Sequence, residues 1–120
     1  MLTDAQGNTL SNATADAASL FVTAVDEFAR YAGDPIARID AAIAAAPDFA
    51  MAHIFKAHMF ATATEPAAAA AAKDILATAR DLKLDEREAS HATAIAHVLD
   101  GNWTRAALAL DHHTMRWPHD

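Results

Sequence analysis

Apolar residues recur at intervals of three and four along most of the chain, a spacing that predicts amphipathic helices rather than strands. Six such segments alternate with short stretches that contain Gly, Pro, Asp or Asn. The predicted apolar faces are Leu20, Phe21, Ala24, Val25 and Phe28; Ile36, Ile39 and Ile43; Met51, Ile54, Phe55, Met59 and Phe60; Ile75, Leu76 and Ala79; Ala92, Ile95, Val98 and Leu99; and Trp103, Ala106 and Leu110. We therefore predict an all-α fold.

Helix-capping signals set most of the predicted boundaries. Residues 1–10 predict an irregular arm, and a first helix is expected over 12–31. Asp34 followed by Pro35 predicts the N-cap and first turn of the second helix, which ends before Pro47.

The later helices have similar start signals. Asp48 predicts the cap of the third helix, and the segment 64–66 predicts the start of the fourth. Asp85 and Glu88 predict a capping box before the fifth helix, and a sixth is expected over 103–117. Because every connection is short, consecutive helices are expected to be antiparallel, which gives one domain of three hairpins at about 12–46, 48–82 and 85–117.

Composition limits the classes of function. The net charge is −7, and Lys and Arg form no cluster, so we expect no nucleic-acid partner. The absence of Cys excludes disulfides, thiol nucleophiles and Cys-based metal sites. The sequence contains no charge-free stretch of about 20 apolar residues, so it predicts no transmembrane helix. The first residues lack the basic and apolar regions of a signal peptide, so we expect no membrane partner and a cytoplasmic location.

The segment after Gly101 has the spacing of a helical repeat. Gly101 and Asn102 predict a tight turn, after which Trp103, Ala106 and Leu110 fall on one helix face. The spacing of Ala106, Leu110, His113 and Pro118 recurs as Pro35, Ile39, Ala42 and Pro47, and as Ala72, Leu76, Ala79 and Leu84. This register resembles the second half of a tetratricopeptide repeat (TPR). The resemblance implies an α-α superhelix of three TPR-like hairpins that binds proteins or peptides and carries no catalysis.

A narrower resemblance extends over nearly the whole chain. It is to the N-terminal part of bacterial proteins similar to tetratricopeptide repeat protein 38, and its short motifs are Thr3-Asp4-Ala5-Gln6-Gly7, Tyr31-x-Gly33-Asp34-Pro35, Pro47-x-Phe49-Ala50-Met51-Ala52-His53, Glu86-Arg87-Glu88 and Gly101-x-Trp103. Proteins of that family are longer and their biochemical role is poorly defined. The resemblance therefore implies either a fragment of a longer repeat protein or a short relative.

Histidine is the residue type that most suggests chemistry. The pairs His53/His58 and His91/His97 are spaced too widely for two metal ligands on one helix face. A C-terminal group has the side chains for adventitious transition-metal binding: Asp111, His112, His113 and His119. Ser90 and His91 are adjacent on a helix, so their side chains are expected to diverge. We predict no enzyme activity, cofactor or functional metal, and keep metal binding or catalysis as a third alternative.

The repeat register predicts a partner-binding groove on the first helices of the hairpins. Its residues are Met51, Ile54, His58, Glu88, His91 and Ile95. The alternative reading is that Met51, Ile54 and Ile95 belong to the core.

The last helix suggests a second surface. Trp103 is expected in the core, but Leu108, Leu110, Met115 and Trp117 leave an apolar patch at the open end of a stack. Self-association through this end, as a homodimer of the last hairpin, is the alternative function; a following segment that covers the patch is the other possibility.

Overall fold

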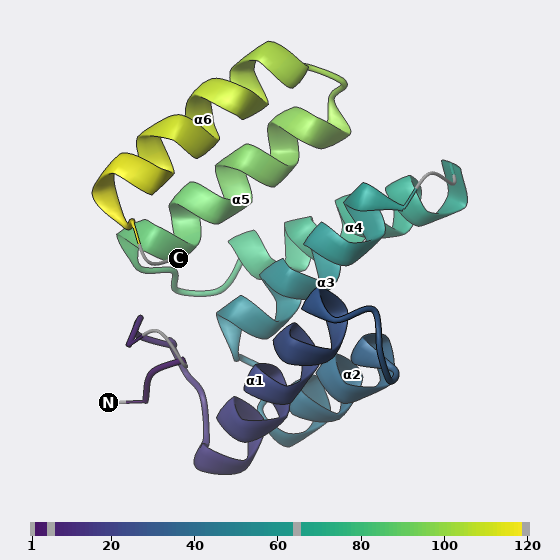
Figure 1. Ribbon diagram of the computed structural model, residues 1–120, viewed down its shortest axis with the longest axis vertical. Helices are drawn as coiled ribbons and strands as arrows, with labels where there is room; N and C mark the ends of the chain where they lie inside the picture. The colour runs from purple at the N-terminus through teal and green to yellow at the C-terminus, as the bar shows by residue number, and fades with distance from the viewer. Residues whose placement is uncertain (1, 5–6, 64–65, 119–120) are drawn as a thin grey trace. The chain divides into compact units, whose positions relative to one another are not determined.

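The computed structural model describes residues 2–4, 7–63 and 66–118, and these contain six helices. The helices are α1 (Ala15–Ala29), α2 (Pro35–Ala45), α3 (Ala50–Thr62), α4 (Pro66–Arg80), α5 (Glu86–Leu99) and α6 (Trp103–Arg116) (Figure 1). The all-α prediction is confirmed, and the helix order is consistent with three helical hairpins. The chain divides into two compact units, Met1–Ala52 and His53–Asp120, which are described separately below.

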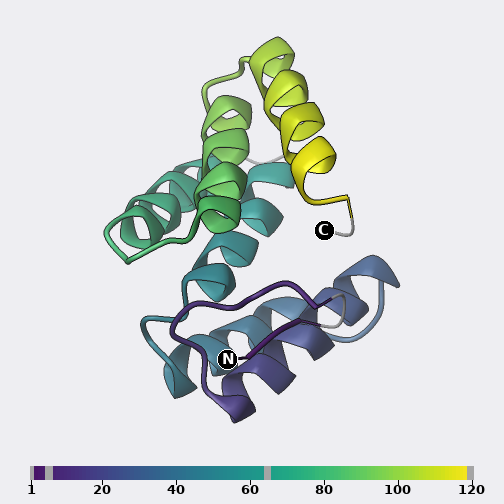
Figure 2. The same ribbon diagram turned by 90° about the vertical axis from the view of Figure 1, so that its left-hand side faces the viewer.

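In the first unit, α1 and α2 pack side by side (Figures 1 and 2). Phe21 of α1 contacts Phe49, whose ring centroid lies 5.4 Å away, and Ile39 of α2 is fully buried. Ala24 and Ala42 are also fully buried. Small side chains at these positions let the two helix backbones approach closely, so this core is built on short contacts as well as on aromatic area.

The turn between α1 and α2 is held by Glu27. Its carboxylate accepts a hydrogen bond from the backbone N–H of Asp34 at 2.9 Å and an ion-paired one from Arg38 Nε at 2.7 Å. Asp34 caps α2 by accepting from the Ala37 N–H at 3.0 Å. Gly33 has φ of 65°, and a Cβ there would overlap the Glu27 carboxylate. Because Asp34 is the N-cap and Pro35 the first residue of α2, the predicted start of the second helix is confirmed.

The predicted N-terminal arm is mostly irregular where it is described. Thr3 and Thr9 form one isolated antiparallel bridge, and the Leu10 N–H donates to the carbonyl of Leu2 at 3.0 Å. The Leu10 side chain is buried, at 4% exposure.

In the second unit, α5 packs against both α4 and α6 (Figure 1). Its core is again rich in small residues, and the buried apolar side chains include Ile54, Ala57, Met59, Ala72, Leu76, Ala79, Ala92, Ala94, Ile95 and Ala106. The α5 capping box is confirmed, because Asp85 accepts from the Glu88 N–H and Glu88 accepts from the Asp85 N–H. Asn102 caps α6.

Two residues predicted to face the core, Trp103 and Ile36, are exposed instead, whereas Leu110 is exposed as its place in the predicted apolar patch requires. Trp103 is 68% exposed, Leu110 47% and Ile36 38%. Trp103 is the first residue of α6 and lies at the turn end of the hairpin, where α5 has already ended. Helical periodicity places Ile36 and Trp103 on the apolar face of a helix, but it does not show whether a neighbouring element covers that part of the face.

Two boundary predictions also differ from the structure. The first helix begins at Ala15, capped by Thr14, because Asn12 has a positive φ of 61° and cannot belong to it. The third begins at Ala50, so Asp48 lies one residue before the N-cap position. The cap predicted at Thr64-Glu65 falls outside the described residues. Within the described ranges, no helix combines the length and apolarity needed to cross a membrane.

Candidate functional site

The structure buries most of the side chains predicted to line a groove. Met51, Ile54 and Ile95 are buried among core residues, and Glu88 is fully buried. His91 is half-buried and His58 is exposed. A ligand approaching these helices would therefore meet His58 and His91 before the other predicted groove residues.

Glu88 has a structural role at the start of α5. Its Oε1 accepts from the Asp85 N–H at 3.0 Å, and its own N–H donates to Asp85 Oδ1 at 2.8 Å. A carboxylate engaged in this way satisfies the free N–H groups at a helix start and is not offered to a ligand.

Histidines from three helices of the second unit lie close together. The rings of His91 in α5 and His113 in α6 are 4.0 Å apart between centroids. Desolvation and the neighbouring His91 lower the pKa of His58, in α3, below the ordinary value of 6.5. Because His58 keeps contact with solvent, we expect water to offset part of this lowering. The fold thus brings together histidines whose spacing along the sequence did not predict that they meet.

His113 also bonds to Ser90 across the α5–α6 hairpin. Its Nδ1 lies 2.8 Å from Ser90 Oγ, and its ring packs against Trp117 with centroids 4.9 Å apart. A serine bonded to an imidazole is in principle a nucleophile and its base. Here the imidazole is only 4% exposed and lies against two other rings, so the pair acts as a polar link between two helices.

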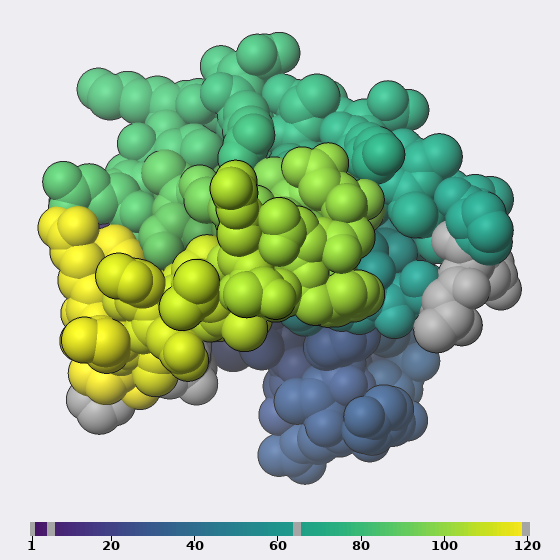
Figure 3. Space-filling view, turned by 90° about the horizontal axis from the view of Figure 1, so that it is seen from above, coloured from purple at the N-terminus to yellow at the C-terminus, as the bar shows by residue number. Residues whose placement is uncertain are grey.

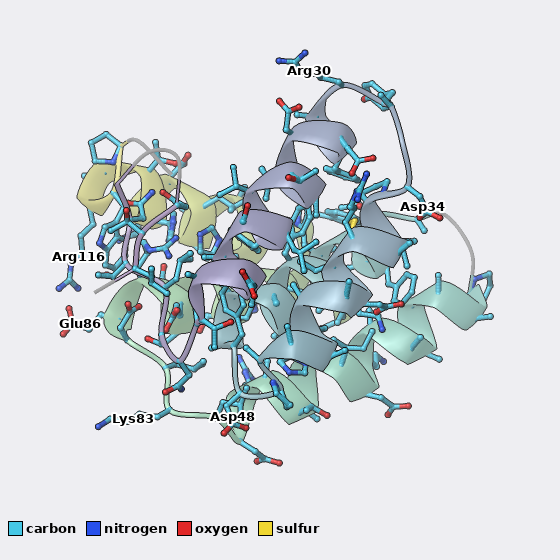
Figure 4. All side chains as sticks on the ribbon, turned by 90° about the horizontal axis from the view of Figure 1, so that it is seen from below. Arg30, Asp34, Asp48, Lys83, Glu86 and Arg116 are labelled. Atoms are coloured by element: carbon cyan, nitrogen blue, oxygen red, sulfur yellow. The ribbon has the colours of Figure 1, made fainter. Side chains whose placement is uncertain are left out.

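Sequence reasoning missed this pair because it considered Ser90 together with the adjacent His91. The signal was present in the predicted turn: residues roughly equidistant from Gly101 on either side face each other in an antiparallel hairpin. Glu86 and Arg116 obey the same rule and form an ion pair at the far end of the hairpin, where Figure 4 shows their side chains facing each other. Arg116 also stacks over the Trp117 ring.

The predicted C-terminal metal group does not assemble among the residues that the structure describes. Asp111 and His112 are exposed, whereas His113 is buried and bonded to Ser90. In the same described ranges, no set of three His, Cys, Asp or Glu side chains is close enough to hold a metal ion. His119 lies outside them.

Large exposed apolar side chains gather on one helix. Four of the six such residues in the described chain belong to α6, namely Trp103, Leu108, Leu110 and Met115. We call these four residues the α6 outer face. Met115 is the most exposed of them, at 82%. Figure 3 shows α6, in yellow-green and yellow, at the surface of its unit.

The structure separates the three residues predicted for an open-end interface. Leu108 and Met115 are exposed, as an interface in a free monomer requires. Trp117 is half-buried, because its ring lies between His113 and Arg116.

Comparison with protein-family models, with curated proteins and with solved structures found no match for this chain.

Proposed function

We propose that this protein is a non-catalytic protein-interaction scaffold of the tetratricopeptide-repeat type, and that it binds its partner through the α6 outer face. The observation that carries the proposal is the concentration of exposed Trp, Leu and Met side chains on α6. Exposed apolar clusters of this kind mark binding surfaces, because burying them against a partner releases water from apolar area.

The burial pattern supports the repeat register. All of Ala72, Leu76 and Ala79 are buried in α4, and Ile39 and Ala42 occupy equivalent buried positions in α2. Small residues at such positions permit the close helix approach that repeat hairpins need. Leu110, at the corresponding position of α6, departs from this pattern by being exposed.

Protein is the partner class that the surface favours. The α6 outer face is apolar, and the chain carries a net charge of −7, which disfavours anionic nucleic acid. The half-buried Ser90–His113 pair ties α5 to α6, which supports a scaffold without catalysis. We include a cytoplasmic location in the proposal, since a chain without Cys needs no oxidising compartment for disulfides.

Site-specific photo-cross-linking in the protein's own cells tests the proposal. A benzophenone amino acid replaces Leu108, and as a matched control it replaces Ile36, an exposed apolar residue on α2. We expect irradiation to join a defined protein partner to position 108 and not to position 36. The proposal is wrong if position 108 gives no protein adduct, or if both positions give the same adducts.

A further inference from the structure

We propose that the α6 outer face binds a second copy of this chain, with the two α6 helices antiparallel across a two-fold axis. This inference rests on the proposed function, because it uses the same binding surface on α6. It adds the identity of the partner and the register of the contact.

The register comes from a stripe of exposed residues along α6. Trp103, Ala107, Leu110 and Thr114 are all exposed, and their spacing of four, three and four residues is that of a coiled-coil seam. Along this stripe a large side chain alternates with a small one. A seam of this kind packs well only where each large residue meets a small one.

Antiparallel pairing supplies that match. Each layer of the seam is one residue from each copy. Leu110 of one copy then meets Ala107 of the other, and Trp103 meets Thr114, so that every layer holds one large and one small side chain. A parallel pair would instead place Trp103 against Trp103 and Ala107 against Ala107. That arrangement alternates crowding with voids, both of which are unfavourable.

Charge on α6 is compatible with two copies meeting. Across the exposed arc from Leu110 round to Leu108, at 100° per residue, Asp111 is the one charged side chain. Antiparallel pairing places Asp111 beside Thr104 in the first turn of the other α6. The positive end of the helix dipole and the Thr104 hydroxyl both favour a carboxylate there. Arg116 points to the other side of the helix, where it pairs with Glu86.

The size of the face sets the expected affinity. A helix of 14 residues is about 21 Å long, and a seam of one Trp, one Leu, one Ala and one Thr buries on the order of 300 Å². Stable interfaces bury about 800 Å² on each partner. We therefore expect a reversible dimer with a dissociation constant in the micromolar range.

Sedimentation velocity on the purified chain, over about 5 μM to 1 mM, tests the dimer. We expect a reversible monomer–dimer equilibrium. Leu110→Glu should weaken it at least tenfold, because it buries a carboxylate in the seam. Ile36→Glu, which adds the same charge at an exposed apolar site on α2, should leave the dissociation constant within about twofold of the wild-type value. Circular dichroism confirms that both variants keep their helices.

Disulfide trapping tests the register, since the chain has no Cys of its own. Ala107→Cys and Leu110→Cys chains are mixed and oxidised mildly. Antiparallel pairing predicts that the mixed 107–110 disulfide forms faster than either like-residue disulfide, as read by mass spectrometry. Faster like-residue disulfides would overturn the antiparallel arrangement.

The outcomes separate this inference from the proposed function. A chain that stays monomeric to 1 mM, or a dimer indifferent to Leu110→Glu, overturns the second-copy proposal. If position 108 still cross-links to a different protein in cells, or to a following segment of a longer chain, the second copy is not the occupant. Only the absence of protein adducts from position 108 removes the interaction function itself.

Discussion

Gly33 shows how a single residue positions two helices. Its positive φ suits glycine, and the space that a side chain would need is filled by the Glu27 carboxylate. That carboxylate bonds to the Asp34 N–H and to Arg38, so it links the end of α1 to the start of α2. The Gly33-Asp34-Pro35 part of the sequence motif is therefore explained by backbone geometry and helix capping.

Replacing Gly33 with Ala is expected to destabilise the first unit. The strained φ costs about 1–2 kcal/mol, and moving Glu27 aside adds about 1 kcal/mol for its lost hydrogen bonds. Urea unfolding followed by circular dichroism measures the effect. Gly101→Ala is the matched control, because Gly101 also has a positive φ but nothing lies within 4 Å of an added Cβ. Equal losses in the two variants would contradict the role given to Glu27.

Ser90→Ala tests the structural reading of the Ser90–His113 pair. The substitution removes one partner of a buried imidazole, so we expect the free energy of unfolding to fall by about 1–2 kcal/mol. Ser19→Ala, at an exposed site on α1, should cost less than about 0.5 kcal/mol. An unchanged stability for Ser90→Ala would show that the contact contributes nothing to the hairpin.

At the scale of helices, capping residues were the most reliable sequence signals. The predicted caps Asp34 and Asp85 each cap the helix that follows, because a cap acts through hydrogen bonds to residues two or three positions away. Such contacts are visible in sequence. The cap predicted at Asp48 misses by one residue. Which face of a helix is covered depends on neighbours far along the chain, and Ile36 and Trp103 were misassigned for this reason.

The α5 capping box provides an element-scale prediction. Asp85→Ala leaves the Glu88 N–H without its acceptor and should lower stability by about 1 kcal/mol. Asp85→Asn should retain most of that energy, since an amide oxygen also accepts. Backbone hydrogen exchange of the α5 amides, measured at increasing urea concentrations, gives the loss of stability for each variant. Equal losses for Ala and Asn would mean that charge, rather than the cap hydrogen bond, matters.

At the scale of the whole molecule, stability should depend on pH through His58. Its folded-state pKa lies below 6.5, so the unfolded chain takes up the proton at a higher pH than the folded one. The stabilisation is complete above pH 6.5 and is lost as the pH falls from there through the folded-state pKa. His91, which contacts His113, is the facing group that opposes this protonation.

The measurement is the urea midpoint between pH 8 and pH 5. We expect the midpoint to decrease over this range and to decrease less in His58→Gln. His112→Gln, at an exposed site on α6, is the control and should follow the wild-type curve. If the urea midpoint of His58→Gln decreases with falling pH as steeply as that of the wild type, His58 is not the source of the pH dependence.

The chain's own pattern determined the number, order and approximate bounds of the helices, since periodicity, caps and prolines act over a few residues. Tertiary structure alone decided the fate of the chemistry-bearing residues. It joined Ser90 to His113, brought the His91 ring against His113, and left Trp103 exposed. Those outcomes depend on which helices meet and in what register, a long-range property that apolar spacing along one helix does not encode.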